Sequence, residues 1–436
     1  MNLSERDQNV IWHPYTQMKD AATPIAIVKG DGAYLFDEYG KRYIDAVSSW
    51  WVNIHGHAHP YIAQRVSEQL NKLEHLMFAG FTHQPAVELA ERLLTHLPSN
   101  QSKIFYSDNG STAVEVALKM AIQYRHNRGE EKKKVIAFNN SYHGDTFGAM
   151  SVSARSAFTN PFSDFLFDVI YIDAPYPDNA EKSISQFNNA ISNNEVTAFI
   201  FEPLVQGAGG MLMYKSEYLQ QIINICNAHD IITIADEVMT GFGRTGKFFA
   251  MDHLDADADI FCLSKGLTGG TMALGVTSCN AKIFDAFLSD DKSKTLFHGH
   301  SYTANPLACT AGLASLDLLE MNECWNNIKR IEHQHKSFYE ILKNNKNIKD
   351  IRQCGTILAI EIETGDGTGY FNNIRDKAYN YFLDKGIILR PLGNVIYIMP
   401  PYCINEEDLI YVYQSIEEFI NNLLPNSFDL VPNSSD

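Results

Sequence analysis

The sequence predicts an α/β protein, with a large domain built on a mostly parallel central sheet and a smaller α+β domain formed by both ends of the chain. Three observations support this fold class. The 436 residues are 45% hydrophobic and 11% aromatic, which is typical of a folded globular enzyme and excludes global disorder. Short apolar runs alternate with helical patterns through the middle of the chain. Both ends of the chain lack this alternation.

The predicted strands of the central sheet are short runs rich in β-branched residues. They lie at residues 103–106, 135–138, 169–172, 198–201, 231–235, 260–263 and 274–278. Helical patterns separate them, and strands that alternate with helices form βαβ units, so we predict a largely parallel sheet.

The two ends of the chain carry different patterns. Residues 22–45 predict two alternating strands around glycine-containing turns, which is a β-meander. From about residue 321 onward, a long polar helix at 322–344 precedes strands at 357–363 and 395–399. We expect the tail from Ser427 onward to be frayed.

These patterns predict two domains, although the length alone would allow about three. The large domain is predicted at residues 49–320. The small domain would combine residues 1–48 with residues 321–436.

The composition excludes several classes of function. The net charge is −17, from 35 Lys and Arg against 52 Asp and Glu, whereas general binders of nucleic acid or anionic membranes need a basic surface. No apolar run of about 18 residues could span a bilayer, and the first residues lack a signal-peptide pattern, so we expect a cytoplasmic protein. The run His55-Gly56-His57-Ala58-His59 resembles a metal tract. No carboxylate or cysteine lies at a supporting spacing, so no metal site is predicted.

Ligands of open parallel sheets bind beyond the carboxyl ends of the strands, so the residues that follow each strand are candidates. After the strand at 103–106, the turn Ser107-Asp108-Asn109-Gly110 leads into a helix at Ser111-Thr112. Glycine allows a close backbone approach, and free N–H groups at the helix start, with the Ser111 hydroxyl, can hold a phosphate. The same residues also make an ordinary helix N-cap.

Two further strand ends carry charged side chains. Asp236 follows an apolar strand, where a carboxylate is costly unless it has a partner. Lys265 follows the next strand, and a partly desolvated lysine can lose its proton and attack a carbonyl group. Each of them could alternatively be an ordinary loop charge.

The spacing of these two residues favours a shared site. Asp236 and Lys265 lie 29 positions apart, which suits one strand, a crossover and the next strand of one sheet. A carboxylate for a pyridinium nitrogen, a lysine for a Schiff base and a phosphate cradle together describe a site for pyridoxal 5′-phosphate. A fourth strand end supplies Tyr142 and His143, and thus an aromatic side chain that could cover the cofactor ring.

The chain resembles a known family, the class III or ω-amino aminotransferases of fold type I. The segments that carry the resemblance are IADEVMTGFGRTGKFFA, LSKGLTGG, NGSTAVEVALK and YHGDT, and it extends from about His13 to Pro401. It implies the fold type I architecture of the pyridoxal-phosphate-dependent transferases. Segments such as WHPYTQM, SSWWVNIHGHAHP and ILRPLGNVIYIMPPY are similar to the members that move an amino group from S-adenosylmethionine to 8-amino-7-oxononanoate in biotin biosynthesis.

Carried over residue by residue, the resemblance implies roles around the cofactor. Lys265 would form the Schiff base and move the substrate proton, and Asp236 would hold the pyridinium nitrogen protonated. Tyr142 would stack on the ring and shape the substrate pocket, while Gly110 and Ser111 would bind the phosphate. Two half-reactions in one site would give ping-pong kinetics.

A second loop implies a homodimer with a shared active site. Gly299, His300 and Ser301 match the family loop that reaches the phosphate of the partner subunit. The family pattern has Pro and Thr where this chain has His300 and Ser301. Ser301 keeps a hydroxyl for the phosphate, whereas the role of His300 is open, since either its backbone or its side chain could contribute.

For the substrates, Tyr15, Trp50, Trp51 and Arg390 resemble the recognition set, and Tyr397 lies in the same region. The planar guanidinium of arginine suits the carboxylate at the end of 8-amino-7-oxononanoate. Simpler interpretations are that one tryptophan is a core residue and that Arg390 is a surface ion-pair partner. Arg244 and Glu202 also match the family, and we leave both out of the predicted catalytic set.

Three other functions remain open on the sequence. One is a class III aminotransferase that uses lysine or an ω-amino acid as donor. Another is a pyridoxal-phosphate-dependent aminomutase, which needs no external donor. A third is a binding protein without catalysis, against which the retained Lys265 and Asp236 argue.

Overall fold

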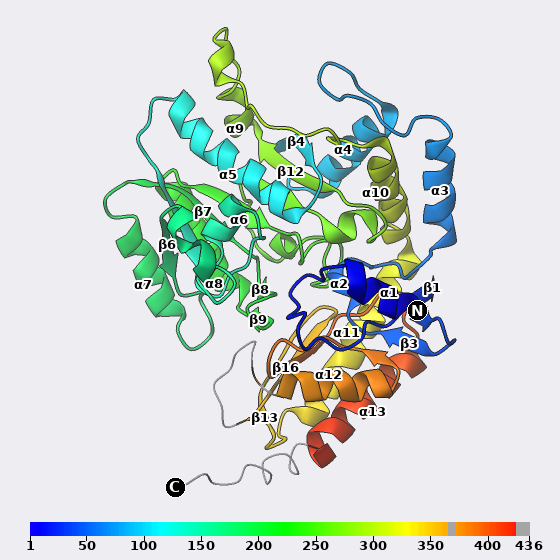
Figure 1. Ribbon diagram of the computed structural model, residues 1–436. Coiled ribbons are helices and arrows are strands. Elements are labelled where there is room, and N and C mark those ends of the chain that lie inside the picture. Colours follow the sequence, from blue (N-terminus) through cyan, green and yellow to red (C-terminus); the bar gives the residue numbers. More distant parts are fainter. Residues whose placement is uncertain (365–371, 373, 424–436) are drawn as a thin grey trace.

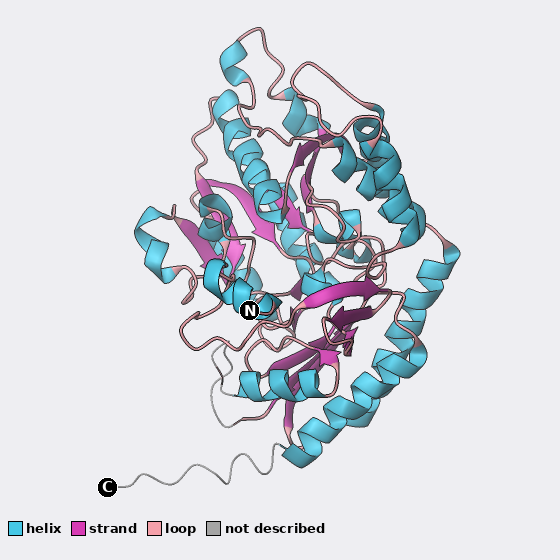
Figure 2. Ribbon diagram, turned by 45° about the vertical axis from the view of Figure 1, so that its right-hand side comes forward, coloured by secondary structure: helices cyan, strands magenta, loops and turns pink. Residues whose placement is uncertain are grey.

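The computed structural model of the protein describes residues 1–364, 372 and 374–423. Figure 1 shows a large α/β part and, below it, a smaller part that contains both the first strands and the last helices of the chain. Figure 2 shows helices packed around the strands of both parts. The predicted α/β class with a mostly parallel sheet is confirmed.

The large part is built on a seven-stranded sheet with strand order β4-β12-β11-β10-β7-β5-β6. Its strands are β4 (Gln101–Ser107), β5 (Lys134–Phe138), β6 (Val169–Ile172), β7 (Val196–Phe201), β10 (Ile232–Asp236), β11 (Ile260–Leu263) and β12 (Gly275–Asn280). All seven predicted strands are present. Only β12 runs antiparallel to its neighbours in this sheet, so it is mixed but mostly parallel.

Alternate side chains of each strand enter two different cores, as expected for a sheet covered on both faces. In β7, Ala198 and Ile200 join the core beneath the long helix α5, while Phe199 and Phe201 join the core on the opposite face. The helices of this part are α3 (Pro60–Leu70), α4 (Gln84–His96), α5 (Gly110–Asn127), α6 (Phe147–Val152), α7 (Ala180–Ala190), α8 (Ser216–Ala228), α9 (Ala281–Asp285) and α10 (Pro306–Leu319).

The N-terminal region forms three strands rather than the two predicted, namely β1 (Ile27–Asp31), β2 (Tyr34–Asp37) and β3 (Arg42–Asp45). The third strand arises because the buried Asp37 carboxylate accepts hydrogen bonds from the N–H groups of Tyr39 (3.0 Å) and Lys41 (2.8 Å). These bonds close a tight turn at Gly40, which has φ +82°. A fourth strand, β15 (Ile387–Ile388), pairs in parallel with β3, so both ends of the chain share one sheet.

The C-terminal region adds a three-stranded antiparallel sheet of β13 (Ile348–Cys354), β14 (Ile357–Ile362) and β16 (Val395–Ile398). Its helices are α11 (Asn322–Leu342), α12 (Ile374–Asp384) and α13 (Glu406–Glu418), and α11 matches the predicted polar helix. The domain boundaries at residues 48 and 320 stay a prediction. The predicted frayed tail from Ser427 lies outside the described residues.

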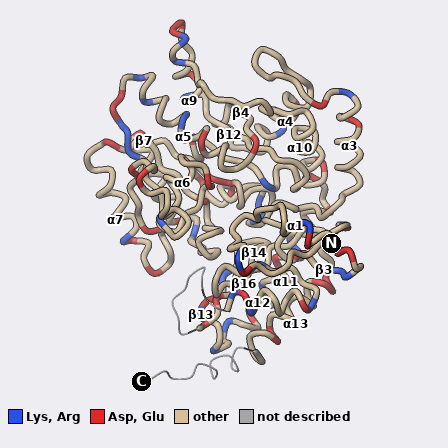
Figure 3. Tube along the Cα trace, in the orientation of Figure 1, with Lys and Arg blue, Asp and Glu red and all other residues tan. Residues whose placement is uncertain are grey.

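The remaining short elements are α1 (Leu3–Val10), α2 (Ser48–Trp51), β8 (Val205–Gln206), β9 (Leu212–Met213), the 3₁₀ turns η1 (Asn160–Phe165), η2 (Ala250–His253), η3 (Lys265–Thr268) and η4 (Lys292–Lys294), and the π turn η5 (Phe419–Leu423). Charged residues of both signs are spread over both parts of the molecule (Figure 3). Across the described residues, every helix is too short or too polar to cross a membrane.

Candidate active site

A cavity of about 1780 Å³ lies at the carboxyl ends of the parallel strands, where the large part meets the sheets formed by the chain ends. We distinguish a lysine end, around Lys265, and an arginine end, around Arg390. The cavity brings together seven of the predicted site residues, Tyr15, Trp50, Trp51, Tyr142, Lys265, Arg390 and Tyr397.

Lys265 begins a short 3₁₀ turn (Lys265–Thr268) after β11, with a left-handed backbone at φ +48°. Its ammonium nitrogen lies 4.9 Å from the centre of a Trp51 ring. Desolvation lowers the pKa of Lys265 to about 8, while the carboxylates of Asp236 and Glu202 oppose the shift. A substantial fraction of this amine is therefore neutral near physiological pH, as a nucleophile requires.

Asp236 is the last residue of β10, and β10 pairs in parallel with β11, the strand that precedes Lys265. This is the arrangement that the spacing predicts. Asp236 is buried, and its Oδ2 lies 2.7 Å from His143 Nδ1 while its Oδ1 accepts a bond from the Val238 N–H at 3.1 Å. His143, which we predicted only as a ring cover, thus orients the carboxylate.

Glu202 is a further buried carboxylate at the lysine end. It follows β7 and accepts hydrogen bonds from the N–H groups of Tyr142 (3.0 Å) and Gly207 (3.0 Å). Burial raises its pKa to about 7, with His143 lowering it and Asp236 raising it further. The sequence analysis left Glu202 aside, although its position just after a buried strand is the signal that identified Asp236.

At the start of α5, Ser111 Oγ accepts the Asp145 N–H at 3.3 Å, and its O–H can still donate to a ligand. Asn109 is the N-cap, because its side-chain oxygen accepts the Thr112 N–H at 3.0 Å, so Ser111 is not needed for capping. A Cβ at Gly144 would lie 2.1 Å from Ser111 Oγ, so only glycine lets the loop after Tyr142 pass this close. A Cβ at Gly110 would likewise meet Val238 Cγ1 at 2.6 Å.

At the arginine end, aromatic rings frame a guanidinium group. The Arg390 guanidinium carbon lies 4.2 Å above a Trp50 ring. Tyr15 contacts Trp50 edge-on, with ring centres 5.7 Å apart. The Tyr15 hydroxyl lies 3.3 Å from the Tyr142 hydroxyl and donates to the Asp145 carboxylate. Asp145 was missing from the predicted set, although it stands in the YHGDT segment.

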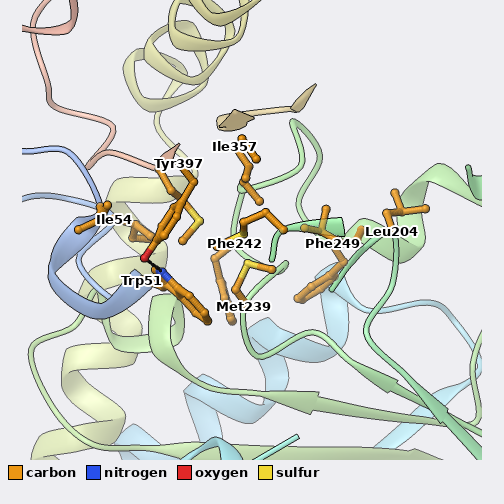
Figure 4. Close-up of a cluster of buried hydrophobic side chains, with 14 of the residues drawn as sticks. Trp51, Ile54, Leu204, Met239, Phe242, Phe249, Ile357 and Tyr397 are labelled. Atoms are coloured by element: carbon orange, nitrogen blue, oxygen red, sulfur yellow. Dashed lines mark hydrogen bonds between the residues drawn. The ribbon is translucent and has the colours of Figure 1, made fainter. Parts of the chain in front are cut away.

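The two adjacent tryptophans have different environments. Trp50 is 41% exposed, whereas Trp51 is 7% exposed. The Trp51 indole N–H donates to the Tyr397 hydroxyl at 2.9 Å, and Figure 4 shows this pair among buried apolar side chains. Tyr397 comes from β16, so this bond links the N-terminal and C-terminal segments at the cavity wall.

The turn that carries both tryptophans is strained. Ser48, Ser49 and Trp51 have φ values of +51°, +60° and +66°. Such left-handed conformations cost about 1–3 kcal/mol each in residues other than glycine, and they persist only where surrounding contacts hold them.

The loop with Gly299, His300 and Ser301 does not line the cavity of this chain. Ser301 is exposed, and the Thr303 hydroxyl accepts a hydrogen bond from the His300 N–H at 3.1 Å. This placement leaves the loop free to serve another molecule, and it does not test the predicted role in a partner subunit.

The comparisons with known proteins agree with this geometry. Residues 15–420 match the family model described as aminotransferase class III. An adenosylmethionine-8-amino-7-oxononanoate aminotransferase from Synechococcus elongatus is 44% identical over 95% of this chain and 99% of that protein.

The chain belongs to the class III aminotransferases.

Two solved structures have the same fold. The crystal structure of adenosylmethionine-8-amino-7-oxononanoate aminotransferase from Methanocaldococcus jannaschii has a TM-score of 0.91 and 37% identity, covering 96% of this chain and 98% of that one. An ω-transaminase from Pseudomonas jessenii, in complex with PMP, has a TM-score of 0.92 and 26% identity over 98% of this chain and 99% of that one. Fold type I is therefore confirmed.

As a class III aminotransferase, the protein uses pyridoxal 5′-phosphate, and its residues fit this group. Lys265 supplies an amine of lowered pKa for the aldehyde. Asp236 supplies a buried carboxylate suited to a pyridinium nitrogen. The N–H groups at the start of α5 and the Ser111 hydroxyl are donors of the kind that a phosphate requires, and Gly144 lets the loop after Tyr142 pass close to this hydroxyl.

Proposed function

We propose that the protein transfers an amino group from S-adenosylmethionine to 8-amino-7-oxononanoate, giving 7,8-diaminononanoate, a step of biotin biosynthesis. The names of relatives at 44% and 39% identity, each covered almost completely, support this proposal. The aminotransferase class rests on the family. The substrates rest on the arginine end of the cavity together with those names.

The observation that supports the proposal most strongly is the environment of the Arg390 side chain. Its guanidinium stacks on Trp50, lines the cavity, and has no hydrogen-bond or ion-pair partner among the described residues. An arginine at a cavity wall without a carboxylate of its own suits a carboxylate that arrives with the ligand. The apolar faces of Trp50 and Tyr15 beside it suit the aliphatic chain of an oxononanoate.

Each residue at the lysine end has a proposed task. When bound, pyridoxal 5′-phosphate supplies the aldehyde that carries the amino group and a pyridinium ring that withdraws electrons. Lys265 would bind it covalently and then move the proton at the substrate carbon with its neutral amine. Asp236, oriented by His143, would keep the ring nitrogen protonated.

The other predicted contacts are part of the same proposal. Tyr142 would cover the ring, and Gly110 and Ser111 would hold the phosphate. Tyr15, with Asp145, would help to select between the two substrates, because both hydroxyl contacts lie at the arginine end. Both substrates would use one Lys265 in turn, so we expect ping-pong kinetics.

We also propose a homodimer in which Gly299, His300 and Ser301 complete the site of the partner subunit. The loop beside them exposes large apolar side chains, with Phe297 71% and Tyr302 66% exposed, and surfaces of this kind are typical of interfaces. The cytoplasmic location predicted from the sequence is likewise a proposal.

A donor screen tests the function. The purified, cofactor-loaded protein is mixed with S-adenosylmethionine, lysine or an ω-amino acid, and the loss of the visible absorption of the lysine-bound cofactor is followed. We expect only S-adenosylmethionine to convert the cofactor to its pyridoxamine form, and added 8-amino-7-oxononanoate to restore the band.

Other outcomes would assign another function. If only lysine or an ω-amino acid converts the cofactor, that compound is the amino donor in place of S-adenosylmethionine. Isomerisation of one amino ketone without a donor would indicate an aminomutase. A protein without any visible band after loading would contradict the assignment to aminotransferase catalysis.

A further inference from the structure

The turn beneath the arginine end depends on one buried carboxylate, that of Asp45. Asp45 is the last residue of β3 and is fully buried. Its Oδ1 accepts the Val47 N–H at 3.1 Å, and its Oδ2 accepts the Ser49 N–H at 2.7 Å. Both donors belong to the strained turn that leads into Trp50 and Trp51, so this carboxylate closes the turn by two hydrogen bonds.

A histidine and an asparagine extend this contact toward the lysine end. Asp45 Oδ2 also lies 2.8 Å from His57 Nε2. The other ring nitrogen of His57 faces the Asn53 amide at 2.9 Å. With the Asn53 oxygen toward the imidazole, the Asn53 NH₂ donates to the carbonyls of Gly56 (2.7 Å) and Gly269 (3.2 Å).

Gly269 connects this network to the reactive lysine, because it is the C-cap of the 3₁₀ turn Lys265–Thr268. The Asp45, His57 and Asn53 side chains therefore join the turn of the tryptophans to the turn of Lys265 by hydrogen bonds. None of the three lines the cavity itself. They can influence a substrate only through the residues they hold.

We propose that Asp45 is a positioning residue for substrate recognition. Its carboxylate holds the Val47–Trp51 turn in its left-handed conformation, which keeps Trp50 under the Arg390 guanidinium and Trp51 over the Lys265 amine. Without this carboxylate the Val47 and Ser49 N–H groups lose their acceptor, and the strain of the left-handed residues favours relaxation of the turn around Trp50. Trp50, half exposed and without a core to hold it, then moves away from Arg390.

Asp37 offers a matched control. It is a buried carboxylate that ends the neighbouring strand β2 and closes a turn through two backbone N–H groups, as Asp45 does. The turn that it closes does not line the cavity. Asp37→Asn should therefore reproduce the loss of stability caused by Asp45→Asn without its effect on the substrate site.

The first measurement does not depend on the identity of the substrate. In the cofactor-loaded protein, the near-ultraviolet circular dichroism difference between the wild type and Trp50→Phe defines the signal of Trp50. We expect Asp45→Asn to lose this signal and to retain the cofactor, and we expect Asp37→Asn to keep both. A Trp50 signal that survives in Asp45→Asn overturns the proposal.

The second measurement rests on the proposed function. We expect Asp45→Asn to raise KM for 8-amino-7-oxononanoate about tenfold or more and to change kcat by less than about threefold, because ground-state binding is lost. In a Trp50→Phe background the same change should add little, since the two residues act through one contact. Equal effects of Asp45→Asn and Asp37→Asn on KM would reduce Asp45 to an ordinary structural residue.

Two further outcomes are separable. If the wild type does not turn over 8-amino-7-oxononanoate, the proposed function fails while the circular dichroism still decides the role of Asp45. If Asp45→Asn does not fold, His57→Gln is measured in the same way, because it removes the imidazole contacts to Asp45 Oδ2 and to Asn53 but keeps the bonds from Asp45 to the Val47 and Ser49 N–H groups. We expect a smaller loss of the Trp50 signal in the same direction, and an unchanged signal overturns the proposal.

Discussion

At the lysine end of the cavity, Lys265 and Asp236 follow two neighbouring strands of one sheet, and His143 follows a third strand of that sheet. At the arginine end, Trp50 and Arg390 come from the N-terminal and C-terminal regions of the chain, which are joined by the sheet that β3 shares with β15 and by the bond from Trp51 to Tyr397. The carboxylates at the lysine end have hydrogen-bond partners in the protein, whereas Arg390 stacks on Trp50 and has no hydrogen-bond or ion-pair partner among the described residues.

This difference predicts that the reaction takes place at the lysine end and that the arginine end sets the substrate specificity. A site on the strand ends of one sheet is fixed by the core on both faces of that sheet, which suits chemistry that tolerates little displacement. A site assembled from turns of both chain ends can change without disturbing that core. We therefore expect changes at the lysine end to abolish the reaction and changes at the arginine end to alter which substrate reacts.

The largest effect is expected from Lys265→Ala. The variant loses both the covalent attachment of the cofactor and the base for proton transfer, so turnover should fall by about 10⁴-fold or more. Stopped assays of product formation measure this loss, and the absorption spectrum shows whether the cofactor still binds. The exposed Lys247, which bonds to the Asp252 carbonyl, serves as control in Lys247→Ala. Activity in Lys265→Ala within tenfold of the wild type would contradict the assigned role.

The lysine end is also the part that sequence could predict. Periodicity predicted all seven strands of the large sheet, and Asp236 and Lys265 follow two of them at a spacing that suits adjacent strands. The partnership of His143 with Asp236 was beyond sequence reasoning, because no pattern states which side chain a buried carboxylate meets.

The residues of the arginine end could be predicted only from the resemblance to a family. Arg390 follows a two-residue strand, and Trp50 lies on a turn whose left-handed residues are not glycine, so no local signal marks either position. The third strand of the N-terminal region was not predicted for a similar reason. Its turn is closed by the Asp37 carboxylate rather than by a common pair of turn residues.

Arg390→Ala should have the second largest effect and should separate the two ends. Removing a desolvated partner of a carboxylate costs about 2–5 kcal/mol, so kcat/KM for 8-amino-7-oxononanoate should fall by roughly 30-fold to several thousandfold. Single-turnover measurements of each half-reaction test this, because the half-reaction with the amino donor should lose much less. Arg390→Lys, which keeps the charge but not the planar fork, should recover only part of the loss. Equal losses in both half-reactions would place Arg390 in the common chemistry.

The rate of cofactor capture should change about tenfold with pH, and this change should depend on the lysine end alone. With a pKa of about 8 for Lys265, the neutral fraction of the amine rises about tenfold between pH 7 and pH 9 and then levels off. The rate at which the cofactor-free protein captures pyridoxal 5′-phosphate should follow this curve. Asp236→Asn should move its midpoint to lower pH, because the Asp236 charge raises the pKa of Lys265. A rate that still rises steeply above pH 10 would indicate an ordinary lysine.

The smallest effect is expected from Tyr397→Phe, which removes the acceptor of the buried Trp51 indole N–H. An unsatisfied buried donor costs about 1–3 kcal/mol, so the free energy of unfolding in urea should fall by that amount. Tyr106→Phe is the matched control, because Tyr106 is also buried and its hydroxyl donates to the Ala86 carbonyl, away from the cavity. Both variants should lose similar stability, but only Tyr397→Phe should raise KM for the oxo substrate, by a few-fold, since Trp51 is adjacent to Trp50. If both variants leave KM unchanged, the hydrogen bond between Trp51 and Tyr397 does not affect the position of Trp50. Specificity then depends on the contact between Trp50 and Arg390 alone.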